Sequence, residues 1–155
     1  MSNERPGICA GCGECCRTRP GAEAPERFLA DPDPAAALAR ALASRDWVLA
    51  RHVATRYPRP ATVAERAGGV VHAGAELSPC VFLEPSGCRL SFADRPRMCR
   101  DLEPWANGDC QSTWDLPQAA EAWEPWQALV ERALGRSYCG SGGQGGHSTQ
   151  SPGVS

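Results

Sequence analysis

Four cysteines lie within eight residues near the start of the chain, in the stretch ICAGCGECCR. They are Cys9, Cys12, Cys15 and Cys16. Such a density constrains the chain, because closely spaced thiols act as disulfide partners, as redox nucleophiles or as metal ligands. The rest of the sequence has to decide among these three roles.

The sequence as a whole argues against a disulfide framework. It has nine cysteines, an odd number that would leave one thiol over. The first residues, MSNERPGICAGCG, contain no apolar region typical of a secretory signal. No run approaches the ~18 apolar residues of a membrane span. We therefore expect a cytoplasmic protein with no membrane partner, in which thiols stay reduced.

Composition favours a fold that needs support beyond an apolar core. Leu, Ile, Val and Phe together number 23 of 155 residues, or about 15%. Below ~20%, a chain has few large apolar side chains with which to form a core. Nine cysteines could supply the support as metal ligands. The net charge of −2 gives no attraction to nucleic acid. All sixteen basic residues are arginine, which excludes a catalytic lysine.

Hydrophobic periodicity predicts a small α+β fold that is mostly helical. A long helix is expected within residues 31–58, capped by Asp33 and ended by Pro58 and Pro60. A second helical stretch is expected over residues 114–136, interrupted at Pro125. The apolar stripe of this stretch is expected to pack in the core; its residues are Trp123, Trp126, Leu129, Val130 and Leu134.

The stretch CVFLEPSGCRLSF predicts a β-hairpin that carries cysteines. CVFL and CRLSF are strand-like, and EPSG between them is typical of a turn. This hairpin would bring Cys80 and Cys88 close together, and a short helix after Asp94 would carry Cys99. With irregular loops, residues 1–139 would form one domain organised around a metal site, followed by a flexible Gly/Ser-rich tail over residues 140–155.

The spacing of the first cysteines favours metal ligation. Cys-x-x-Cys lets two thiolates from one tight turn reach one metal ion. Cys9, Cys12 and Cys15 match the first three ligands of the bacterial ferredoxin run, but the fourth cysteine and its proline do not follow. Cys15 and Cys16 are adjacent, and neighbouring side chains in an extended segment point to opposite sides. They would therefore serve two centres, or one would bind metal while the other packs or reacts.

A second set of cysteines would complete the ligands. Cys80, Cys88 and Cys99 could meet the first four on folding, so that metal affinity becomes folding energy. Cys110 would make eight thiols, enough for two four-thiolate centres, whereas Cys139 looks like a stray thiol. Zinc and iron–sulfur centres both take four cysteines, so the count leaves the metal open.

Three segments, CAGCGECCR, SPCVFL and GCRLSFADRPRMCR, resemble the CxxCxxCC cysteine-cluster family, also described as the YkgJ-like zinc- or iron-chelating domain. The resemblance implies chelation of Zn(II) or an iron–sulfur cluster, and it defines no reaction. Family members often carry an aromatic residue in the strand before Arg-Pro, commonly as Ile-Tyr. This chain has Leu90-Ser91-Phe92 there, and its last third lies outside the match. The implied ligands are Cys9, Cys12, Cys15, Cys16, Cys80, Cys88 and Cys99.

Two alternatives stay open beside a metal-binding protein with an iron–sulfur cluster or Zn(II), in which a cluster would carry out electron transfer or other redox work. One is a structural zinc module that shapes a small domain for a protein partner. The other is a thiol-dependent oxidoreductase that uses an unligated member of the Cys15–Cys16 pair. The sequence contains no phosphate-binding loop, no legible pair of carboxylates for acid–base work and no Ser/His/Asp arrangement, so no catalytic residue is assigned.

Overall fold

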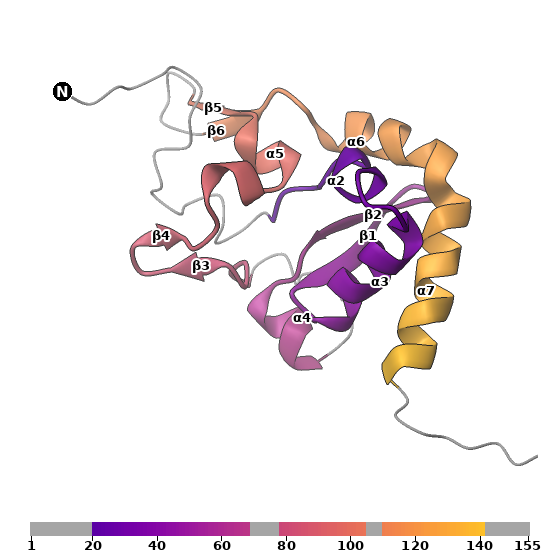
Figure 1. Ribbon diagram of the computed structural model, residues 1–155. Helices are drawn as coiled ribbons and strands as arrows, with labels where there is room; N and C mark the ends of the chain where they lie inside the picture. The colour runs from indigo at the N-terminus through magenta and orange to yellow at the C-terminus, as the bar shows by residue number, and fades with distance from the viewer. Residues whose placement is uncertain (1–19, 69–77, 105–109, 142–155) are drawn as a thin grey trace, which may run out of the picture.

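The computed structural model describes residues 20–68, 78–104 and 110–141, and it has a small α+β architecture (Figure 1). Within these ranges, helices are combined with antiparallel two-stranded sheets formed by β1–β2, β3–β4 and β5–β6. No helix in them is long and apolar enough to cross a bilayer. The elements in chain order are α2 (Glu26–Leu29), α3 (Pro34–Ala43), β1 (Trp47–His52), β2 (Thr55–Pro60), α4 (Val63–Gly68), β3 (Leu83–Glu84), β4 (Gly87–Cys88), the 3₁₀ helix η2 (Phe92–Asp94), α5 (Arg97–Arg100), β5 (Leu102–Pro104), β6 (Cys110–Ser112), α6 (Leu116–Trp123), the 3₁₀ helix η3 (Glu124–Trp126) and α7 (Gln127–Ser141).

The long helix predicted within residues 31–58 is correct only for α3, and the later part of that stretch is the β1–β2 hairpin. As expected, the side chain of Asp33 caps α3 by accepting a hydrogen bond from the Ala36 amide, at 3.2 Å. Beyond α3, Arg45 adopts a left-handed conformation with a φ of 64°, which a right-handed helix cannot continue. The aromatic and β-branched residues that follow favour extended backbone over helix.

The two prolines that were expected to end a helix lie within strand β2. Pro58 and Pro60 stand opposite Leu49 and Trp47 of β1, at positions whose backbone faces away from that strand. Proline is tolerated there because no ladder hydrogen bond needs its missing N–H. The Pro58 carbonyl accepts a hydrogen bond from the Glu23 amide at 2.9 Å, which joins the segment before α2 to the sheet.

The C-terminal helical stretch is interrupted at Pro125, as predicted. Helix α6 ends at Trp123, the turn η3 contains Pro125, and α7 begins at Gln127. Asp115 and Gln118 form a capping box that starts α6. Helix α7 then lies along α3 on one side of the molecule (Figure 1). Helices α3 and α7, which lie near the two ends of the described chain, therefore cover one face of the core together.

The apolar stripe predicted on this stretch packs in the core, with one exception. Trp123, Leu129 and Val130 are buried, and Leu134 packs against the same cluster. Trp126 was predicted wrongly, because 37% of it is exposed. It lies in the 3₁₀ turn, where three residues complete a turn and the side chain is rotated away from its α-helical position.

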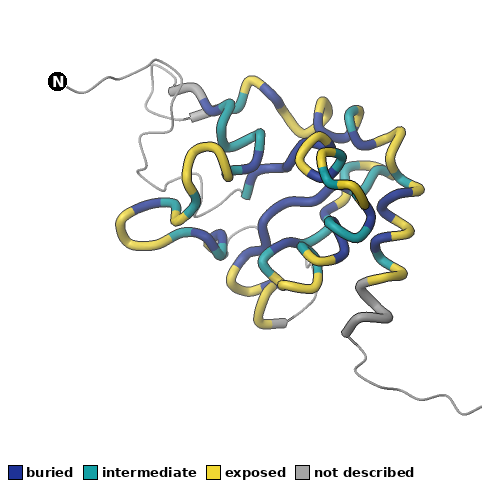
Figure 2. The backbone as a smooth tube through the Cα atoms, viewed as in Figure 1, coloured by how far each residue is buried: buried dark blue, intermediate teal, exposed yellow. Residues whose placement is uncertain are grey.

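The main core consists of small side chains packed around a few large aromatic ones, and it follows the dark blue backbone in the middle of Figure 2. Phe28 links it to a second cluster, because the Phe28 ring contacts Trp123 at 6.1 Å and Trp47 at 6.3 Å between centroids. The second cluster contains Trp47, Cys80 and Phe82, and it therefore includes one predicted ligand. The buried members of the main core are Ala22, Ala24, Phe28, Ala35, Leu38, Ala39, Ala50, Tyr57, Trp114, Ala119, Trp123, Leu129, Val130 and Ala133.

Candidate metal centre

Cys80 is held by backbone pairing with the segment that leads into α4. Thr62 and Cys80 form an isolated antiparallel bridge. On either side of it, the Val63 amide donates to the Pro79 carbonyl at 2.8 Å, and the Val81 amide donates to the Ala61 carbonyl at 3.0 Å. Cys80 is 6% exposed. Its place in the fold is therefore set by main-chain contacts on both sides of the residue.

The segment that pairs with Cys80 is itself anchored by a buried ion pair. Arg59 donates two hydrogen bonds to the carboxylate of Glu65, at 2.7 and 2.9 Å, and the Thr62 amide donates a third at 2.9 Å. The Glu65 amide in turn donates to the Thr62 hydroxyl at 3.2 Å, which completes a capping box at the start of α4. Glu65 is only 1% exposed.

The pKa of Glu65 reflects two opposing effects. Burial on its own would raise the pKa, because it penalises the charged carboxylate. The hydrogen bonds from Arg59 and Thr62 outweigh burial and hold the pKa below its usual range. The carboxylate is therefore charged at neutral pH, and the anchor beside Cys80 is a true ion pair.

Cys88 lies on the predicted hairpin, which is shorter than expected. Strand β3 pairs with β4 over two residues each, so Cys88 stands opposite Leu83 and not opposite Cys80. Gly87 has a φ of 119°, a left-handed conformation that glycine adopts readily. Cys88 is half-buried and packs against the cluster that contains Cys80 and Phe82. The hairpin thus brings the two cysteines into one cluster, although it does so by packing and not by direct strand pairing.

Cys99 lies on the short helix α5, as predicted, and the start of the described chain runs directly against it. A Cβ atom added to Gly21 would lie 2.6 Å from the Cys99 Sγ and 3.1 Å from the Met98 Cβ. The Met98 amide also donates to the Ala22 carbonyl at 3.1 Å. Position 21 therefore has to be glycine for the backbone to approach α5 this closely. In the sequence, Cys16 precedes Gly21 by only five positions.

The other predicted ligands are not reached by the structure. Cys9, Cys12, Cys15 and Cys16 lie outside the described residues. Cys110 belongs to strand β6, opposite Pro104, and only its backbone is described. Within the described ranges, no three or more Cys, His, Asp or Glu side chains gather as they would to hold a metal ion. Cys80, Cys88 and Cys99 by themselves therefore do not form a complete site.

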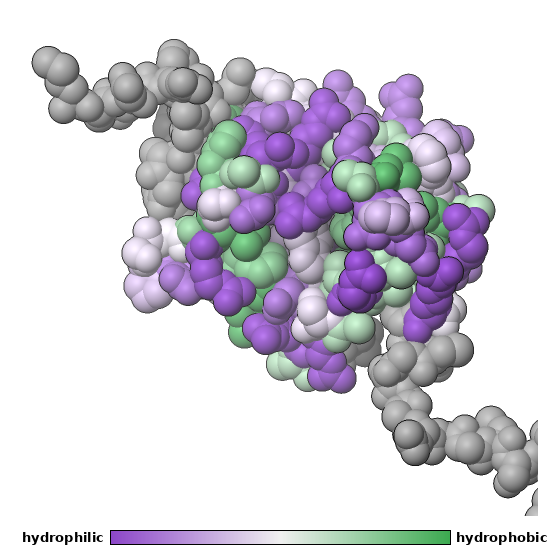
Figure 3. All heavy atoms as spheres, viewed as in Figure 1, coloured by the Kyte–Doolittle hydropathy of each residue, from purple (hydrophilic) through white to green (hydrophobic). Residues whose placement is uncertain are grey.

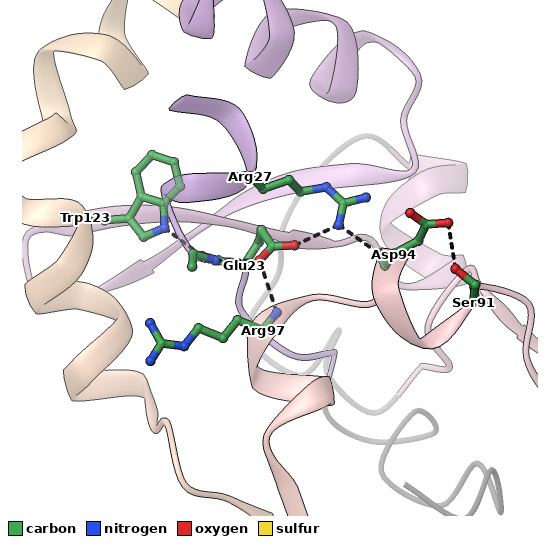
Figure 4. Close-up of polar contacts among 7 residues, drawn as sticks. Glu23, Arg27, Ser91, Asp94, Arg97 and Trp123 are labelled. Carbon is green, nitrogen blue, oxygen red and sulfur yellow. Dashed lines mark hydrogen bonds and ion pairs between the residues drawn. The ribbon is translucent and has the colours of Figure 1, made fainter. Parts of the chain in front are cut away.

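Sequence reasoning missed Glu23, which connects the segment before α2 to helices α5 and α6 (Figure 4). Its buried carboxylate accepts hydrogen bonds from the Ala24 amide at 2.7 Å, the Arg97 amide at 3.1 Å and the Arg27 guanidinium at 2.9 Å. Its backbone carbonyl accepts one from the Trp123 indole at 2.7 Å. The available signal was a single acidic residue within the small, apolar run GAEAP. Buried, Glu23 ties α2, α5 and α6 to one another.

Comparison with family models, with curated proteins and with solved structures found no match. The resemblance to the CxxCxxCC cysteine-cluster family stays a prediction from the three quoted segments.

Proposed function

We propose that this chain is a thiolate metal-binding protein that holds Zn(II) or an iron–sulfur cluster. The observation that carries the proposal is the spacing of seven cysteines along the chain. They are Cys9, Cys12, Cys15, Cys16, Cys80, Cys88 and Cys99. Soft thiolate ligands at Cys-x-x-Cys spacing suit zinc and iron–sulfur centres.

The described part of the site supports this reading in two ways. Cys80 and Cys88 pack in one cluster although eight positions separate them. Gly21 touches Cys99, and five residues of chain reach at most about 18 Å. The last cysteine of the CxxCxxCC box is therefore within reach of α5 by covalent connection alone.

Cysteine thiolates are suitable ligands for Zn(II) and for an iron–sulfur cluster, although the described residues contain too few of them for a complete site. One ion or cluster takes four cysteines, and the described part contributes two clustered cysteines and a third on α5. At least one further thiolate, from the box or from Cys110, would have to complete any centre. A bound zinc would stabilise the fold, whereas a bound cluster would add electron transfer.

A structural zinc module is the second candidate, and the composition of the core favours it. Seven of the fourteen buried residues in the main cluster are alanine, and alanine contributes little apolar area, at ~25 cal/mol per Å². A domain with such a core gains much from a metal cross-link. In this version the metal shapes a surface for a protein partner and carries out no reaction.

The deciding experiment is the metal and acid-labile sulfide content of protein purified without oxygen, with its absorption spectrum. Iron and sulfide in a brown protein would support a cluster. One or two zinc ions in a colourless protein would support the structural module. Protein that is fully folded and contains neither metal would refute both, and it would turn attention to rapid alkylation of the Cys15–Cys16 pair as a test of thiol chemistry.

A further inference from the structure

A buried ion pair lies beside the segment that pairs with Cys80. Hydrophilic side chains cover much of the outer face of the protein, as the purple atoms in Figure 3 show. Arg59 and Glu65 are exceptions, because only 8% and 1% of them are exposed. Taking two opposite charges out of water costs free energy that their attraction often does not offset, and apolar residues of similar size often stabilise a core equally well. Stability alone therefore does not explain this pair.

The backbone amides of residues 61–63 donate to acceptors on three different segments of the chain. The amide of Thr62 donates to the Glu65 carboxylate at 2.9 Å, within the start of α4. The other two bonds run from the Ala61 amide to the Asp46 carbonyl at 2.8 Å and from the Val63 amide to the Pro79 carbonyl at 2.8 Å. Of these three donors, only the third therefore reaches the segment that carries Cys80.

The acceptor of the Thr62 amide controls how Cys80 is placed. Thr62 is fully buried, so its amide needs an acceptor within the protein. In the observed bridge, Thr62 and Cys80 stand opposite each other with their side chains on the same face, and the Thr62 amide points away from Cys80. Without the Glu65 carboxylate, this amide would turn toward the carbonyls of residues 79–81. Such a change shifts the pairing by one residue, which moves a side chain to the opposite face.

Arg59 holds the Glu65 carboxylate where the Thr62 amide requires it. Its guanidinium donates to the two carboxylate oxygens at 2.7 and 2.9 Å, and to the Pro60 carbonyl at 2.9 Å. A planar fork that is bound at three points keeps one orientation. The Oε1 atom that Arg59 binds at 2.7 Å is also the atom that accepts from Thr62. The ion pair thus fixes the acceptor, and the acceptor fixes the amide.

We infer that Glu65 is a positioning residue for the proposed metal centre, because it holds the Thr62 amide and thereby keeps the Cys80 side chain in the cluster that includes Cys88. Both cysteines belong to that cluster, and a Cys80 side chain turned to the opposite face would leave it. The inference rests on the proposed function in that Cys80 has to be a ligand. It goes beyond that function because Glu65 binds no metal itself and lies outside every cysteine motif.

The test compares two double variants that both lack the ion pair. Arg59→Met with Glu65→Gln keeps an oxygen acceptor for the Thr62 amide, whereas Arg59→Met with Glu65→Leu does not. Glu65→Asp is a third variant, which keeps the charge, withdraws the acceptor by one methylene group and gives a result even if a double variant fails to fold. Hydrogen exchange of the Val63 and Val81 amides is measured relative to amides of α3 and α7, in protein purified without oxygen. Zn(II) affinity is measured by competition with a chromophoric chelator.

We expect the amides of Val63 and Val81 to exchange at least tenfold faster, relative to the two helices, in the leucine variant and in Glu65→Asp, but not in the glutamine variant. Zn(II) binding should weaken at least tenfold in the same two variants. Equal exchange ratios in the two double variants would overturn the inference, and so would changed ratios with unchanged affinity for Zn(II). Wild-type protein that contains no metal and binds no Zn(II), with the exchange ratios as expected, would refute the proposed function and still support the placement of Cys80 by Glu65.

Discussion

At the residue scale, the backbone of Gly21 packs so close to Cys99 that no side chain fits between them. Gly21 has no Cβ, and the space where one would stand is 2.6 Å from the Cys99 Sγ and 3.2 Å from the Cys99 amide nitrogen. The Cys99 Sγ would have to shift to make room for a Cβ, and the Cys99 amide nitrogen, which belongs to the backbone of α5, leaves it little space to do so. The glycine therefore sets how near the N-terminal segment comes to Cys99.

Gly21→Ala should consequently destabilise the protein by about 1–3 kcal/mol, the usual cost of overpacking. The measurement is the free energy of unfolding in urea, together with metal content. The chain offers a matched control in Gly135→Ala, because a Cβ at that position in α7 meets nothing within 4 Å. The control should gain about 0.5–1 kcal/mol, since alanine is the better helix former. Equal effects of the two substitutions would mean that the contact with Cys99 does not matter.

Cys88 tests whether the hairpin contributes a metal ligand. Serine replaces the thiol with a hydroxyl of similar size, so Cys88→Ser should lose bound metal and lower the melting temperature by about 5 °C or more. The comparison is Cys139→Ser, expected to change neither value. Metal content and melting temperature at the wild-type level in Cys88→Ser would remove this residue from the proposed ligand set.

At the scale of elements, the start of α4 depends on one buried ion pair. The pKa of Glu65 is lowered from its usual 4.5 by Arg59 and Thr62 despite burial. A carboxyl group whose folded pKa is depressed stabilises the fold above its unfolded pKa, and it loses that stabilisation as the pH falls through the folded pKa. The contribution of Glu65 is thus complete at neutral pH and declines below about pH 4.5.

Glu65→Gln should therefore cost about 3 kcal/mol at pH 7, because the buried Arg59 would lose its charged partner. Its stability should also fall less steeply than that of the wild type between pH 5 and pH 3. Urea unfolding across this pH range measures both effects, with the exposed Glu121→Gln as control. Parallel acid profiles for wild type and Glu65→Gln would contradict the ionised state argued for Glu65.

At the scale of the whole molecule, the proposed ligands connect distant parts of the chain. Residues 9–16 and Cys99 are about ninety positions apart, and a metal that joined them would close a long loop and stabilise the folded state by mass action. Removing the metal with a chelator should lower the melting temperature of the wild-type protein. Cys12→Ser, already deprived of metal, should not respond to the chelator. A chelator that strips metal without changing the wild-type melting temperature would show that the centre is not structural.

The local sequence was sufficient to predict those helix and hairpin boundaries that depend on a few neighbouring residues. Asp33 before Pro34 predicted the start of α3, Pro125 predicted the break between α6 and α7, and EPSG predicted the turn of the β3–β4 hairpin. Each depends on the chemistry of one cap or one turn. The α+β class followed from the same signals, and so did the candidate ligands, because thiol spacing is a property of the chain itself.

Tertiary contacts decided what these local signals could not. Residues 47–60 have apolar spacing that fits a helix, yet they form a hairpin, because pairing β1 with β2 satisfies the backbone, buries Trp47 and places Pro58 where it bonds to Glu23. The burial of Glu23 depends on partners up to a hundred positions away, and no pattern within a short window encodes them. The sequence by itself thus determined which side chains are candidate metal ligands, whereas only packing decided that Cys80 and Cys88 belong to one cluster and that Cys99 lies against Gly21.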